Sequence, residues 1–242
     1  MQNNIVFFKR DLVNKTTLIY LILALLMGGA FIIGNEYMGG HFGAAGVIGG
    51  YKYIADIMLI YISGAIWGKE FQYRTINMVR ISKRSPLEII LRKLTEMLVL
   101  ALIVAGVLIL ELAFYSLFYH VYLNAYQTAF DLGREAGSIL RDTLVYTFFI
   151  YTLSSIVTLL FKNSMVSFFT VFFGQTALTW AMVFLSTFNK TLGNIFKYVP
   201  FAFSQGGFLD SAYDTRMIWV ILVWGAVLLA ILPYLYRKRA FV

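Results

Sequence analysis

Residues 94–118 read LTEMLVLALIVAGVLILELAFYSLF, a nearly unbroken apolar run with one acidic residue near each end. An α-helix needs about 20 predominantly apolar residues to cross the roughly 30 Å hydrocarbon core of a bilayer. Inside lipid the backbone must satisfy its own hydrogen-bonding groups, which a helix does within one segment. The sequence therefore predicts that residues 94–118 form a membrane-spanning helix.

The same apolar character extends over the whole chain of 242 residues, of which 60% are hydrophobic and 13% charged, with a mean hydropathy of +0.76. Soluble domains contain about 45–50% apolar and about 25% charged residues, so a water-soluble globular protein is excluded. The net charge of +8 does not indicate nucleic acid as a partner, because membrane proteins accumulate Lys and Arg on their cytoplasmic side. The absence of cysteine excludes disulfides, thiolate metal sites and cysteine nucleophiles.

Five further runs are long and apolar enough to cross a bilayer. The first has the basic lead and small residues of a signal peptide, but its apolar stretch continues beyond the small residues and favours a retained helix. We therefore predict an all-α membrane protein with a single transmembrane domain over residues 1–242. The six predicted membrane helices are 17–34, 47–67, 94–118, 142–161, 165–188 and 217–236.

The distribution of basic residues predicts the orientation of the chain. Most of the 20 Lys and Arg residues fall on the side that holds both chain ends and the connection 68–93, and such an excess marks the cytoplasmic side. Both termini are therefore predicted to be cytoplasmic. Residues 1–16 carry Ile5, Phe8 and Leu12 at helical spacing among basic residues, which predicts an amphipathic helix lying on the inner leaflet.

The external connection 189–216 is unusually apolar for a loop. An apolar segment of this kind favours contact with the membrane over exposure to water. We predict that it is re-entrant and caps the outer end of the bundle. The predicted cap residues are Phe196, Pro200, Phe201 and Phe203.

No motif for nucleotide binding or catalysis emerges from the chain. The nearest approach to a phosphate-binding loop, residues 64–70, has one residue too few between its glycines and ends in Glu70, where such a loop needs Ser or Thr to hold magnesium. His41 and His120 belong to neither a metal-binding nor a nucleophile pattern. We therefore expect no active site, cofactor or metal on this chain, so ATP-driven transport would require a separate ATPase.

The cytoplasmic coupling region 69–83 carries the motif that points to a family. A Glu-Phe pair followed by Thr, then a basic turn at Ser85-Pro86 and Lys93 at the start of the third helix, resembles the coupling region of type-2 ABC transporter permeases. The predicted coupling residues are Glu70, Phe71, Tyr73, Arg74, Thr75 and Ile76. Arg74 stands where that family commonly has Gly. The alternative interpretation is a basic loop that only enforces orientation.

The resemblance implies the membrane-spanning permease subunit of an ABC exporter in a bacterial cell membrane. In that family a short helix of the coupling region docks on a soluble ATPase subunit, which binds ATP and Mg. Two permease chains, identical or related, enclose the pathway. The resemblance also implies export of amphipathic or antimicrobial peptides, with drugs and lipids as alternative substrates.

Three ionisable side chains lie deep within the predicted membrane helices: Lys52, Asp56 and Glu111. Charges at such a depth are costly and indicate a function or a partner. Lys52 and Asp56 are four residues apart and can pair, which leaves Glu111 to reach Lys52 or to stay protonated. One interpretation is a charge cluster that gates the outer end of the pathway, a second is a structural lock, and a third is a proton- or ion-coupled carrier.

Polar side chains on the fifth predicted membrane helix are candidates for lining a substrate path. These residues are Thr170, Gln175, Thr176 and Thr179. The alternative is that they make hydrogen bonds between helices inside the bundle.

Overall fold

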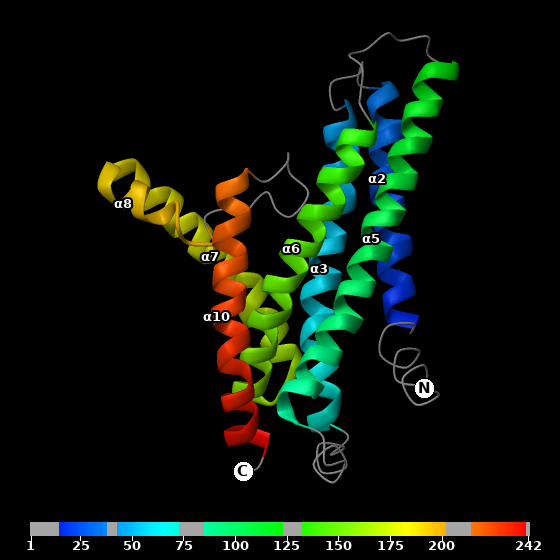
Figure 1. The fold of residues 1–242 in the computed structure, drawn as a ribbon. Helices are drawn as coiled ribbons and strands as arrows, with labels where there is room; N and C mark the ends of the chain where they lie inside the picture. Colours follow the sequence, from blue (N-terminus) through cyan, green and yellow to red (C-terminus); the bar gives the residue numbers. More distant parts are fainter. Residues whose placement is uncertain (1–14, 38–42, 73–84, 123–131, 202–213, 241–242) are drawn as a thin grey trace.

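The computed structural model describes residues 15–37, 43–72, 85–122, 132–201 and 214–240, and in these residues it contains seven α-helices and no strand (Figure 1). The helices are α2 (Lys15–Tyr37), α3 (Gly43–Gln72), α5 (Pro86–Tyr122), α6 (Leu132–Phe161), α7 (Ser164–Phe188), α8 (Lys190–Phe196) and α10 (Thr215–Ala240). The predicted all-α fold is confirmed for this part of the chain. The predicted interfacial helix 1–16 lies almost entirely outside the described residues.

Four helices, α5, α6, α7 and α10, are long and apolar enough to cross a bilayer, which indicates a membrane protein. The described apolar part of α2, Lys15–Phe31, is shorter. The apolar sequence of α3 is interrupted by Lys52 and Asp56. A crossing by all six predicted membrane helices therefore stays a prediction.

The helices extend beyond the apolar ranges expected from the sequence. α5 begins at Pro86 instead of residue 94, and α6 begins at Leu132 instead of residue 142. Ser85 caps α5, because its Oγ accepts a hydrogen bond from the backbone N–H of Glu88 at 3.1 Å. Pro86 is tolerated at the first helical position, because the backbone N–H that proline lacks has no partner within the helix there. A prediction from apolar length misses the helical turns that continue with polar residues.

Figure 1 shows how the helix ends are distributed. The start of α2, the end of α3, the start of α5, the α6–α7 turn and the end of α10 lie at one end of the bundle, which we call the inner end. Consequently α3 and α6 run in the same direction, with their C-terminal ends at the inner end.

The core is built mainly from α3, α5 and α6, which supply the largest fully buried side chains, among them Trp67, Tyr51, Tyr146 and Tyr151. α7 diverges from this bundle toward α8 (Figure 1). Only one narrow stripe of α7 is buried, formed by Ser167, Val171, Gln175 and Thr179. The rest of α7 is mostly exposed and rich in aromatic side chains, as expected for a helix that contacts lipid.

A short turn joins α6 to α7 at the inner end. Lys162 adopts a left-handed backbone with φ of 55°, and Asn163 then caps α7 by accepting hydrogen bonds from the N–H groups of Met165 and Val166 at 2.9 and 3.2 Å. α3 packs closely on this turn, because a Cβ atom on Gly68 would overlap Ser164. The α6–α7 turn and the inner end of α3 are therefore in direct contact.

Candidate functional site

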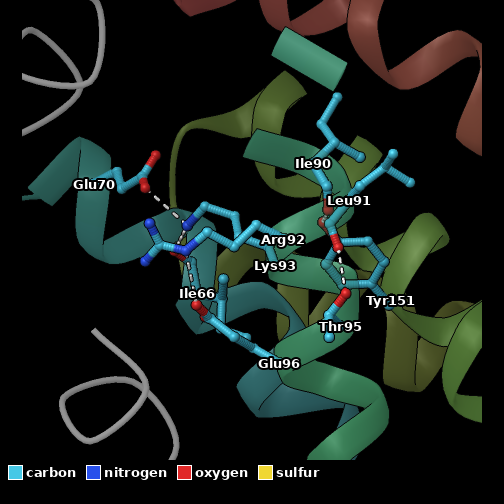
Figure 2. A network of polar contacts seen from close by, with 9 residues as sticks. All are labelled: Ile66, Glu70, Ile90, Leu91, Arg92, Lys93, Thr95, Glu96 and Tyr151. Carbon is cyan, nitrogen blue, oxygen red and sulfur yellow. Dashed lines mark hydrogen bonds and ion pairs between the residues drawn. The ribbon is translucent and has the colours of Figure 1, made fainter. Parts of the chain in front are cut away.

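A buried ion pair joins the inner ends of α3 and α5 (Figure 2). The Nζ atom of Lys93 lies 2.8 Å from Oε1 of Glu70 and donates a hydrogen bond to the backbone O of Ile66 at 2.9 Å. Glu70 is 6% exposed and Lys93 is 5% exposed. At such depth each charge needs its partner, since a lone buried charge is strongly unfavourable. We call Glu70, Lys93 and Trp67 the inner junction.

Trp67 extends the inner junction to α6. Its ring lies under the Lys93 ammonium, 4.6 Å from Nζ to the ring centre, which is a favourable cation–π distance. Its Nε1–H donates to Oγ of Ser155 on α6 at 2.8 Å. The hydroxyl of Tyr151, also on α6, donates to the backbone O of Ile90 on α5 at 2.9 Å, so three helices are tied together by polar contacts within the core.

A second ion pair lies beside the junction on α5. Nε of Arg92 is 3.2 Å from Oε1 of Glu96, one turn further along the helix. Glu96 is buried, whereas Arg92 is partly exposed.

The inner junction includes Glu70 of the last turn of α3, where the predicted coupling region begins. Glu70 and Phe71 belong to the last turn of α3, so this part of the region continues α3 and does not start a separate helix. Phe71 is half-buried. The predicted coupling residues Tyr73, Arg74, Thr75 and Ile76 lie outside the described residues.

The structure brings Asp56 together with Lys52 and with a residue that the sequence did not single out, Tyr146. The charge of Lys52 acts on the Asp56 carboxylate, and the Tyr146 hydroxyl forms a hydrogen bond with it. Tyr146 in turn accepts a hydrogen bond from Nε2 of Gln175 at 3.3 Å. A polar chain therefore runs from α3 through α6 to α7.

Glu111 has different neighbours. Its carboxylate packs against Gly28 of α2, where a Cβ atom would overlap it, and it is 8% exposed. The Glu111 carboxylate interacts electrostatically with the hydroxyl of Tyr51 on α3. Asp56 thus contacts α6, whereas Glu111 contacts α2.

The predicted path residues of α7 fall on two faces. Gln175 and Thr179 are buried against the bundle, whereas Thr170 and Thr176 are exposed. The Thr176 hydroxyl donates to the backbone O of Phe172 at 2.9 Å. Gln175 and Thr179 make hydrogen bonds to other parts of the chain, as expected for groups that join helices.

The segment predicted to be external folds back on α7 before it reaches the bundle. Asn189 ends α7 and caps α8, and the Thr179 hydroxyl donates to the backbone O of Phe201 at 2.6 Å. The ring of Phe201 packs edge-on against Phe149 of α6, with 5.8 Å between ring centres. Trp224 of α10 donates from Nε1 to the backbone O of Tyr198 at 3.0 Å.

Two of the other predicted cap residues are also described. Pro200 is buried and Phe196 is half-buried. Phe203 lies outside the described residues. The described part of the segment is therefore anchored to three helices, α6, α7 and α10.

The sequence did not assign a role to Trp67 or Tyr146. One signal was available for the partner of Lys93: a lysine at the inner edge of a predicted membrane helix needs a counter-charge, and Glu70 is at the matching edge of the neighbouring helix. Nothing in the sequence signalled Tyr146, since buried Tyr residues are common in such helices.

No group of three His, Asp or Glu side chains within the described ranges is placed to bind a metal. The buried charges and aromatic contacts of the inner junction instead hold the helix ends together.

No protein-family model matches the chain, and no curated protein is similar enough in sequence to count as a match.

Proposed function

We propose that the chain is the membrane-spanning permease subunit of an ATP-driven ABC exporter in a bacterial cell membrane. Two permease chains would enclose the pathway, and separate ATPase subunits would bind on the cytoplasmic side. The chain itself would carry no nucleotide site. The proposal combines the coupling-region motif with the six predicted membrane helices and cytoplasmic termini.

The observation that carries this proposal is the inner junction. In the sequence, residues 73–84 connect α3 to α5, and the Glu70–Lys93 pair joins the last turn of α3 to a residue about two turns into α5. A force applied to that segment would act on both helix ends together, because the buried ion pair and Trp67 hold them to each other and to α6. Transmission of a partner's movement as a rigid-body displacement needs such a connection.

The proposed cargo is an amphipathic or hydrophobic peptide. The helix faces are largely apolar and aromatic, and apolar surfaces with few polar groups suit such ligands. Cells that lack the protein should then become more sensitive to amphipathic helical peptides than to drugs of similar hydrophobicity. Equal sensitivity to both would favour drug or lipid export.

The decisive experiment is purification of the full chain from its native membranes under mild conditions, followed by mass spectrometry. We expect an ATPase subunit with a phosphate-binding loop to copurify. Replacing Phe71 and Tyr73 with Ala should reduce its recovery, because aromatic side chains commonly anchor interfaces. Phe114→Ala is the matched control, since Phe114 is an exposed aromatic on α5 outside the coupling region. Intact chain without any such ATPase would contradict the proposal.

A second candidate is a proton- or ion-coupled carrier. The contact of Asp56 with Lys52 and Tyr146 supports it, since ionisable groups inside membrane helices often belong to proton pathways. This candidate predicts transport by the purified chain alone in liposomes when a proton gradient is applied, without ATP. Transport that requires ATP and a second subunit would exclude it.

A further inference from the structure

Two buried hydroxyl groups of α6 behave differently from their neighbours. Hydroxyl groups within helices commonly donate to the carbonyl one turn earlier. Thr143, Ser155 and Thr158 do so, at 2.6, 2.6 and 2.7 Å. Thr147 and Ser154 are also fully buried, yet their hydroxyl oxygens have no hydrogen-bond partner among the described residues.

α3 presents two oxygens of the same kind. Ser63 is fully buried and its Oγ has no hydrogen-bond partner in the described ranges, and the same holds for the buried Oδ1 atom of Asp56. Residues seven positions apart lie on nearly the same face of a helix. Asp56 and Ser63 therefore share one face of α3, and Thr147 and Ser154 share one face of α6.

Two contacts set the alignment of these faces. Asp56 bonds to Tyr146, and Trp67 bonds to Ser155 at 2.8 Å. Since α3 and α6 run in the same direction (Figure 1), Ser63 lies between the two contacts on α3, and Thr147 and Ser154 lie between them on α6. We call Asp56, Ser63, Thr147 and Ser154 the α3–α6 seam.

Residues seven positions apart are separated by about 10 Å along a helix, at a rise of about 1.5 Å per residue. The seam oxygens therefore form two groups, Asp56 with Thr147 and Ser63 with Ser154, which lie about 9 Å apart along the helices. Two water molecules in line, with three hydrogen bonds of about 2.8 Å, span about 8 Å and can connect the two groups. Buried waters occur where polar groups would otherwise be unsatisfied, and each typically makes 2–4 hydrogen bonds.

We propose that the α3–α6 seam binds a chain of water molecules that hydrates the Asp56 carboxylate inside the membrane. Hydroxyl groups both donate and accept hydrogen bonds, which suits water at every position of the seam. A metal cation is disfavoured, because Lys52 already supplies positive charge beside Asp56. The proposal does not depend on the transport function.

Radiolytic footprinting of the full chain in lipid nanodiscs tests the proposal, because hydroxyl radicals formed from bound water label the side chains beside it. Tyr146 and Tyr51 form a matched pair: both are tyrosines, at 1% and 0% exposure. Tyr146 contacts the seam at Asp56, whereas the Tyr51 hydroxyl donates to Val104 of α5 at 2.9 Å. We expect several-fold more labelling of Tyr146. Equal labelling of the two tyrosines would overturn the proposal.

Variants add a second readout. Thr147→Val with Ser154→Ala removes two seam oxygens, and we expect labelling of Tyr146 to fall toward that of Tyr51. Thr152→Val is the control, because Thr152 is equally buried on α6 but its hydroxyl already donates to Phe149 O at 2.8 Å. A similar fall in the control, or no fall in the seam variant, would contradict a water chain at these residues. The comparison of the two tyrosines in the unaltered chain needs no variant and decides the question if a variant fails to fold.

Discussion

The ammonium group of Lys93 lies 2.8 Å from the Glu70 carboxylate and 4.6 Å from the centre of the Trp67 ring. One cation of α5 is thus held by two residues from the last two turns of α3. The two helix ends on either side of residues 73–84 share one buried charge pair, so neither end can shift far without exposing or separating it.

Loss of the Lys93 charge should destabilise the protein strongly. Lys93→Met leaves Glu70 buried without its partner, which typically costs about 3–5 kcal/mol. Thermal unfolding in detergent should show a marked drop in Tm. Arg216→Met is the control, since both partners of the Arg216–Asp214 pair are exposed, and the loss of an exposed pair should have a small effect. A double variant with Glu70→Gln should recover part of the stability, and equal losses for Lys93→Met and Arg216→Met would contradict the buried-pair interpretation.

Replacement of Trp67 by Phe should weaken the tie between α3 and α6. The variant keeps most of the apolar area but removes the Nε1–H donor to Ser155, with an expected loss of about 0.5–1.5 kcal/mol. A double-mutant cycle with Ser155→Ala measures the interaction directly. Strictly additive effects of the two changes would mean that the contact contributes nothing to stability.

Gly68→Ala should disturb the packing of α3 on the α6–α7 turn. The new Cβ atom would overlap Ser164, and overpacking of this kind costs about 1–3 kcal/mol. Gly29→Ala is the matched control, because no atom lies within 4 Å of a Cβ at that position. Ser164→Gly should rescue Gly68→Ala in an unfolding measurement, and absence of rescue would argue against the contact.

Thr179→Val combined with Trp224→Phe should release the external segment. These changes remove the donors to the backbone of Phe201 and Tyr198. Limited proteolysis should then cut residues 189–201 faster than in the unaltered chain. Thr176→Val serves as control, since the Thr176 hydroxyl bonds only within α7 among its described contacts. Unchanged cleavage would show that other contacts hold the segment.

Under the proposed transport function, Lys52→Met should impair transport while assembly stays intact. The change removes the positive charge that acts on Asp56 within a predicted membrane helix, where a remaining carboxylate is costly. Peptide export from cells and recovery of the assembled complex measure the two effects separately. Unchanged export would rule out a gating role and leave Lys52 as a structural residue.

Apolar length predicted where helices occur, because crossing hydrocarbon demands long apolar runs, and each predicted range lies inside a helix. It did not predict where they end. α6 starts at Leu132 with Arg134 and Glu135 in its first turn, and such residues give no signal of membrane insertion. The Ser85-Pro86 pair did mark the start of α5, because the capping hydrogen bond of Ser85 joins residues only three positions apart in the sequence.

The candidate site was less predictable, because its contacts join residues far apart in the sequence. The Glu70–Lys93 pair spans two helices, and motif resemblance assigned Glu70 to contact with a partner, whereas the structure buries it. Polarity alone suggested that Gln175, Thr179, Thr170 and Thr176 all line a path. In the structure Gln175 and Thr179 are buried, whereas Thr170 and Thr176 are exposed. Polarity locates such residues along a helix but does not determine which neighbour they face.

Asn189 ends α7 and caps α8 as a single residue, with an extended backbone at φ −141° and ψ 109°. No further residue separates the two helices, so the backbone dihedrals of Asn189 set the direction in which α8 leaves α7. A one-residue insertion there would rotate the whole external segment and carry Phe201 away from Thr179. The length of this corner is therefore as constrained as any core position, although it lies at an exposed bend of the chain.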